Sequence, residues 1–76
     1  MNKARRDALQ KISDKIEDLK GQLESLTYEE AEYRDNIPEN LQGTEKYEKA
    51  DTAVSALEEA MENLESAVEN IESAME

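Results

Sequence analysis

Apolar residues recur in alternating steps of three and four through both halves of this 76-residue chain. Residues 57–76 repeat nearly the same phrase three times, as LEEAMEN, LESAVEN and IESAME. Such alternation is the a/d pattern of a coiled coil and predicts two long amphipathic helices. The apolar stripe predicted for the first helix is interrupted only by the charged residue Glu30 and consists of Leu9, Ile12, Ile16, Leu19, Leu23, Leu26, Glu30 and Tyr33. The stripe predicted for the second consists of Tyr47, Ala50, Val54, Leu57, Met61, Leu64, Val68, Ile71 and Met75.

A segment of turn-forming residues, DNIPENLQGT, interrupts the repeat between the two halves. Pro38 disfavours a helical backbone at Ile37, which indicates that the first helix ends near there. Gly43 and Thr44 are typical of a turn followed by a helix N-cap. We therefore expect one helical-hairpin domain over residues 1–76, with a helix at about 3–36, a connection at 37–43 and a helix at about 44–76.

The charges of the two halves favour an antiparallel arrangement. Residues 1–20 carry six basic and four acidic side chains, whereas residues 50–76 carry eight acidic and no basic ones. A hairpin places these segments side by side, in a register that sets Leu9 opposite Ile71. The sequence thus predicts an all-α, antiparallel two-helix coiled-coil hairpin. The basic residues expected to offset part of the negative charge of the acidic helix are Lys3, Arg5, Arg6, Lys11 and Lys15.

Four alanines in the second half predict self-association. They recur every seven residues and widen the apolar stripe to about three positions in seven, which is typical of a bundle rather than a two-stranded coil. The chain has no cysteine or histidine, so neither a disulfide nor the usual zinc site can support a small core. We expect two hairpins to dimerise into a four-helix bundle. The alternative is that alanine serves helix propensity alone. These residues are Ala53, Ala60, Ala67 and Ala74.

No pattern in the sequence indicates catalysis. The usual nucleophiles and bases, cysteine and histidine, are absent, and the two glycines are isolated, which excludes a glycine-rich phosphate loop. We expect no enzyme, no catalytic residue, no cofactor and no metal site. The N-terminus is basic but lacks the apolar run of a secretory signal, and no segment is apolar enough to span a membrane. A cytoplasmic protein is therefore predicted.

The net charge of −11 argues against direct binding of nucleic acid and draws attention to the acidic helix. Its carboxylates form columns that either mimic nucleic acid toward a basic protein surface or serve as a solvated face. The turn end offers a second candidate surface, since aromatic and arginine side chains favour protein contacts. The partner-binding candidates are Glu58, Glu62, Glu65, Glu69 and Glu72 on the acidic helix, and Tyr28, Arg34 and Leu41 near the turn.

The stretch EYRDNIPENLQGTEKYE, residues 32–48, resembles that of small acidic helical-hairpin proteins encoded by phages and prophages of Gram-positive bacteria. Only the turn motif DNIPENLQ is specific in this resemblance. Small phage proteins of this size are often inhibitors of bacterial immunity, including CRISPR nucleases. The resemblance implies a phage-derived interaction protein that inhibits a host defence protein in the bacterial cytoplasm. The alternatives are a structural coiled coil and a sponge for a signalling nucleotide, for which the basic residues available are Arg5, Arg6, Lys11 and Arg34.

Overall fold

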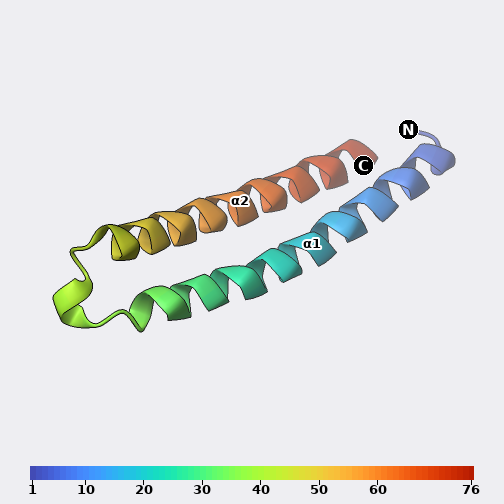
Figure 1. Ribbon diagram of the computed structural model, residues 1–76. Helices are drawn as coiled ribbons and strands as arrows, with labels where there is room; N and C mark the ends of the chain where they lie inside the picture. The colour runs from blue at the N-terminus through green and yellow to red at the C-terminus, as the bar shows by residue number, and fades with distance from the viewer.

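The computed structural model describes all 76 residues as two antiparallel helices joined by a short turn. Helix α1 spans Lys3–Asp35, a 3-10 turn η1 spans Glu39–Leu41, and helix α2 spans Glu45–Met75. The rod measures 59 × 15 × 12 Å, and both termini lie at the end opposite the turn (Figure 1). The predicted all-α helical hairpin is confirmed. Neither helix combines the length and the apolar character that crossing a membrane requires.

The helix ends are set by local side-chain and backbone contacts. The Asn2 side chain caps α1 by accepting a 2.8 Å hydrogen bond from the backbone N–H of Arg5. Thr44 occupies the N-cap position of α2, as predicted, but its side chain does not cap the helix. Its hydroxyl instead donates a 2.6 Å hydrogen bond back to the Leu41 carbonyl, at the end of η1. Thr44 therefore closes the turn rather than satisfying an N–H of α2.

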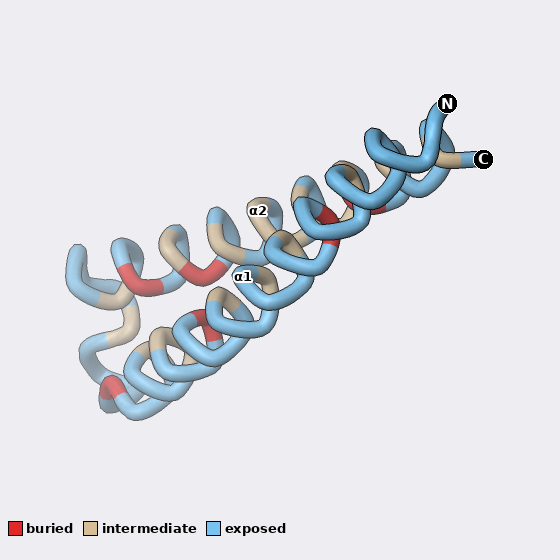
Figure 2. Tube along the Cα trace, turned by 90° about the vertical axis from the view of Figure 1, so that its right-hand side faces the viewer, coloured by how far each residue is buried: buried red, intermediate tan, exposed pale blue.

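Helix α2 turns its predicted apolar stripe toward α1. Every residue of that stripe is buried or half-buried, and the most buried are Ala50, Val54 and Val68. Figure 2 shows the buried segments of α2 along the side that faces the other helix. At the turn, Ile37 is also buried and covers the end of the core. The heptad pattern therefore predicted the inner side of α2 correctly.

Helix α1 differs from the prediction by a rotation about its own axis. Half of its predicted stripe is exposed rather than buried, and the positions one residue later are covered instead. Since one residue is about 100° of helix, α1 is turned by about half that angle from the expected orientation. The exposed residues are Ile12, Leu19, Leu26 and Tyr33, and those that replace them in the interface are Ser13, Lys20, Thr27 and Arg34.

This rotation has a physical cause in the residues that it brings to α2. Ser13 and Thr27 are small enough to be buried between the helices, and the Thr27 hydroxyl donates a 2.7 Å hydrogen bond to the Leu23 carbonyl of its own helix. Lys20 and Arg34 both reach carboxylates of α2. The interface therefore exchanges four large side chains for two small hydroxyls and two ion pairs, and it leaves half of an apolar stripe uncovered.

Candidate interaction surfaces

Two ion pairs connect α1 to α2 and mark one side of the hairpin. The Lys20 ammonium pairs with Glu65, and the Arg34 guanidinium lies 2.9 Å from Asp51. The two pairs are two heptads apart on each helix, so they follow the same edge of the interface.

A cation–π contact marks the other side. The Lys46 ammonium lies 5.5 Å from the centre of the Tyr33 ring. Tyr33 precedes Arg34 by one residue, about 100° around α1, and Lys46 is five residues before Asp51, about 140° around α2. The Tyr33–Lys46 contact and the Arg34–Asp51 pair therefore join the helices along opposite edges.

The side marked by Tyr33 and Lys46 is apolar along its length. Residues spaced by seven stay on one line of a two-helix coil, so the line of Tyr33 runs back through the exposed apolar residues of α1. These side chains are between 45% and 56% exposed. The line of Lys46 on α2 continues through the four predicted self-association alanines, which are half-buried except for exposed Ala74. We call this surface the apolar face; it consists of Ile12, Leu19, Leu26, Tyr33, Ala53, Ala60, Ala67 and Ala74.

The side marked by the ion pairs is acidic. Three carboxylates, those of Glu65, Glu17 and Glu24, surround Lys20, and the Glu17 oxygen lies 3.8 Å from its ammonium. The hydrogen bond to Glu65 and the charges of these carboxylates raise the pKa of Lys20. The same line of α2 continues at seven-residue spacing on either side of Glu65. We call this surface the acidic face; it consists of Glu17, Glu24, Asp51, Glu58, Glu65 and Glu72.

The predicted acidic contact residues fall on this face or next to it. Glu58, Glu65 and Glu72 lie on it, and Glu62 and Glu69 lie on the adjoining outer surface of α2. Only Glu65 is paired within the hairpin; the other four carboxylates are exposed and make no ion pair. Most of the charge of α2 is therefore free to act on another molecule.

None of the basic residues expected to offset the charge of the acidic helix forms an ion pair with α2. Lys3 pairs with Asp7 in its own helix at 3.0 Å, and the other four make no ion pair. Lys11 and Lys15 each lie two residues from buried Ser13, about 200° around α1, and so point away from α2. Net charge per segment does not tell which way each side chain points, so it did not identify the pairs that form.

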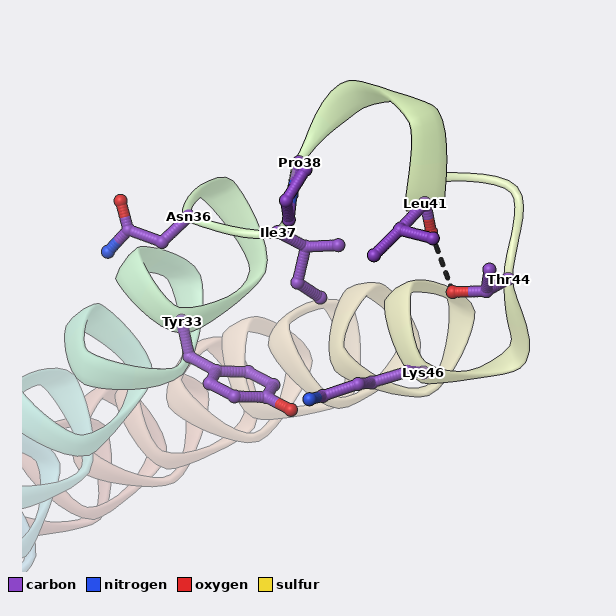
Figure 3. A pocket seen from close by; sticks show the side chains of 7 residues that line it. All are labelled: Tyr33, Asn36, Ile37, Pro38, Leu41, Thr44 and Lys46. Carbon is purple, nitrogen blue, oxygen red and sulfur yellow. Dashed lines mark hydrogen bonds between the residues drawn. The ribbon is translucent and has the colours of Figure 1, made fainter.

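The turn end carries a shallow pocket of about 410 Å³ beside the apolar face. Tyr33, Leu41 and Lys46 are among its walls (Figure 3). Leu41, predicted as a partner contact, is 45% exposed at this pocket, whereas Tyr28 is 66% exposed outside it. The pocket combines an apolar lining with one cation and adjoins the end of the apolar face.

Arg34, the third predicted contact near the turn, is engaged within the hairpin. Its guanidinium lies 3.0 Å from Asp35 and 2.9 Å from Asp51, and its side chain is 23% exposed. Hydrogen bonds to Asp35 and Asp51 raise its pKa. Arg34 therefore ties the two helices together near the turn, and the positive charge that a nucleotide pocket would use is already balanced.

The acidic residues do not gather into a cation site: no group of three or more carboxylates has the geometry to hold a metal ion. Comparison of the chain with protein-family models, with curated proteins and with solved structures finds no match.

Proposed function

We propose that this chain is a non-enzymatic interaction protein that binds a basic surface of another protein through its acidic face. The observation that carries this proposal is the excess of unpaired charge on α2. Residues 50–76 contain eight carboxylates and no cation, and only Asp51 and Glu65 are paired within the hairpin. A stiff helix holds the remaining carboxylates in fixed columns, so binding to a basic surface orders these side chains but carries no backbone ordering cost.

The acidic face acts on a basic partner first through its long-range electrostatic field. A column of like charges steers a basic partner into encounter and gives an association rate that falls steeply with ionic strength. Carboxylates seven residues apart are spaced by about 10 Å along the helix. A protein groove that binds nucleic acid presents rows of Lys and Arg toward phosphates, and the acidic columns would occupy such a groove.

The turn motif that resembles phage-encoded acidic proteins favours a bacterial defence protein as the partner. Many bacterial defence proteins must bind nucleic acid, so their basic grooves are accessible to an acidic rod. Inhibition then follows from competition, because the groove cannot hold the rod and the nucleic acid together. The protein needs no chemistry of its own for this action.

We also propose that the hairpin dimerises through its apolar face into a four-helix bundle. Four large apolar side chains, each about half exposed, lie along one line beside a column of alanines. Each helix of a four-helix bundle contacts two neighbours, which divides its apolar stripe between them. The rotation of α1 divides its stripe in this way: one half faces α2 and the other half faces the uncovered side. Dimerisation also doubles the acidic surface that a partner meets.

The test of partner binding is capture from a bacterial lysate with two matched triple variants. The first reverses charge beside and on the acidic face, as Glu58→Lys, Glu62→Lys and Glu69→Lys. The second makes three reversals on the outer surface of α1, as Asp18→Lys, Glu29→Lys and Glu32→Lys. All six carboxylates are exposed and form no ion pair, and Asp18 accepts one exposed hydrogen bond of 2.9 Å from the Gln22 side chain of its own helix. Both variants should therefore fold.

We expect the parent and the α1 variant to retain a nucleic-acid-binding protein that the α2 variant loses. The captured protein should also lose its nucleic acid when the parent hairpin is added. Equal capture by both variants would refute the role of the acidic face, and equal loss would show that overall charge alone governs binding.

A further inference from the structure

We propose that the two hairpins pack with both turns at the same end, so that each α1 lies on the α2 of the partner. This arrangement rests on the proposed dimer and specifies its geometry. A symmetric dimer that joins two apolar faces has only two simple forms. If its two-fold axis runs along the helices, α1 meets α2; if the axis runs across them, α1 meets α1 and α2 meets α2.

Side-chain size favours the first form. The α1 line of the apolar face carries Ile12, Leu19 and Leu26, whereas the α2 line carries alanine at every seventh residue from 53 to 74. Setting large residues against small ones lets facing layers interdigitate at even helix spacing. Setting like against like would hold the two α1 helices apart and leave space between the two alanine lines.

Charge favours the same form independently. When α2 meets α2, two segments with eight carboxylates each and no cation lie side by side. When α2 meets α1, each acidic segment lies beside the α1 line of the apolar face, which runs from Arg5 to Tyr33 and carries one cation and no carboxylate. Like charges placed together across an interface select against that pairing.

Arg5 supplies a specific contact for this arrangement. It lies seven residues before Ile12, on the α1 line of the apolar face, and makes no ion pair within its own hairpin. Both termini lie at the same end of the rod (Figure 1), so Arg5 would meet the C-terminal end of the partner's α2. A cation is favourable there because the helix dipole is negative at that end and Glu76 adds a carboxylate.

The arrangement also joins the two turn pockets. Tyr33 and Lys46 stand at the turn end of the apolar face and line the pocket (Figure 3). With both turns together, the two pockets form one continuous surface at a single end of the bundle, and the termini gather at the other end. A partner that docks at the turns would then meet two copies of Leu41 at once.

Distances between spin labels test the arrangement directly. The chain has no cysteine, so Asn40→Cys in the turn and Glu59→Cys near the middle of α2 each give one labelling site on an exposed residue. With helix axes 8–10 Å apart, turns at the same end place labels at position 40 within about 30 Å of each other. Turns at opposite ends separate them by most of the 59 Å length of the rod. The label at position 59 gives a short distance in either form.

We expect short distances at both positions in pulsed electron resonance, and loss of the coupling when unlabelled protein is added in excess. A short distance at 59 with a long one at 40 would overturn the arrangement and leave the dimer standing. Absence of coupling at both positions, with a monomer mass by light scattering, would overturn the arrangement and the dimer together. Neither result bears on capture of a partner by the acidic face, which is measured separately.

Discussion

The ammonium of Lys46 in α2 lies 5.5 Å from the centre of the Tyr33 ring in α1, along the edge opposite the two ion pairs that join the helices. The contact lies at the turn end of the apolar face. Residues at seven-residue spacing from Tyr33 and from Lys46 lie on the same side of the hairpin as this contact. The contact therefore identifies which large side chains of α1 and which alanines of α2 share one surface. That surface is the apolar side of the hairpin, and the ion-paired edge is its acidic side.

Leu19→Glu should dissociate the proposed dimer without unfolding the hairpin. Leu19 is 54% exposed in the hairpin, so its replacement removes little from the core of one chain. In the dimer it removes about 1 kcal/mol of burial from each chain and adds a charge to an apolar contact. We expect the dissociation constant to rise at least tenfold in sedimentation equilibrium, with unchanged helical circular dichroism.

Tyr28→Glu is the control for this variant, because Tyr28 is 66% exposed on α1 and lies off the apolar face. It should dimerise like the parent chain. If both variants dissociate alike, the effect is one of added charge and the apolar face is not the contact.

Ala67→Glu and Ser66→Glu test the alanine line with adjacent residues. Each adds one carboxylate to α2, so the change in charge is the same, whereas helix propensity falls by a few tenths of a kcal/mol for Ala67→Glu and does not fall for Ser66→Glu. Ala67 is half-buried on the apolar face, whereas Ser66 is exposed on the outer surface. We expect only Ala67→Glu to weaken self-association, by tenfold or more, when the two are compared by size-exclusion chromatography with light scattering. A weaker dimer for Ser66→Glu would contradict the placement of the interface.

Gly21→Ala should stabilise the hairpin by about 0.5–1 kcal/mol, since glycine inside a helix is less favourable than alanine by this amount. Its backbone φ is not positive, and a Cβ built there meets no atom within 4 Å. The free energy of unfolding in urea measures the effect. Gly43→Ala meets the same open space but lies in the turn, so it should gain less. A loss of stability at position 21 would mean that the outer surface of α1 is covered.

The ion pair between Lys20 and Glu65 should give stability that alkaline pH removes. The hydrogen bond to Glu65 raises the pKa of Lys20 above its ordinary 10.5 in the folded chain. The contribution is therefore fully present below pH 10.5 and is lost as pH rises through the raised pKa. Glu65→Gln should lower the melting temperature at pH 8, and its difference from the parent should shrink toward pH 12.

Glu58→Gln is the matched control for this pH series. It removes the same charge from the same face at a residue without an ion pair. Its melting temperature at pH 8 should exceed that of Glu65→Gln. Equal melting temperatures for the two variants across the whole range would show that the pair contributes nothing beyond the general charge.

Sequence alone identified the helices and the inner side of α2. Alternating steps of three and four, broken by Pro38 and Gly43, are local signals that survive folding unchanged. The N-cap at Asn2 could also have been predicted from the sequence, because asparagine is a preferred residue directly before a helix. Thr44 takes the predicted N-cap position, but its hydroxyl donates a hydrogen bond to the Leu41 carbonyl of η1 instead of capping α2.

Only the tertiary structure decided how α1 is turned about its axis. Periodicity shows that Ile16 and Leu19 share one stripe, but it does not show whether one neighbour or two will cover that stripe. The choice came from contacts distant in sequence: Lys20 and Arg34 reach carboxylates of α2, and small Ser13 fits between the helices. The sequence therefore determined which residues are apolar and which are charged. The packing of the two helices decided which of them were left facing outward, because burial depends on the neighbour that a side chain meets.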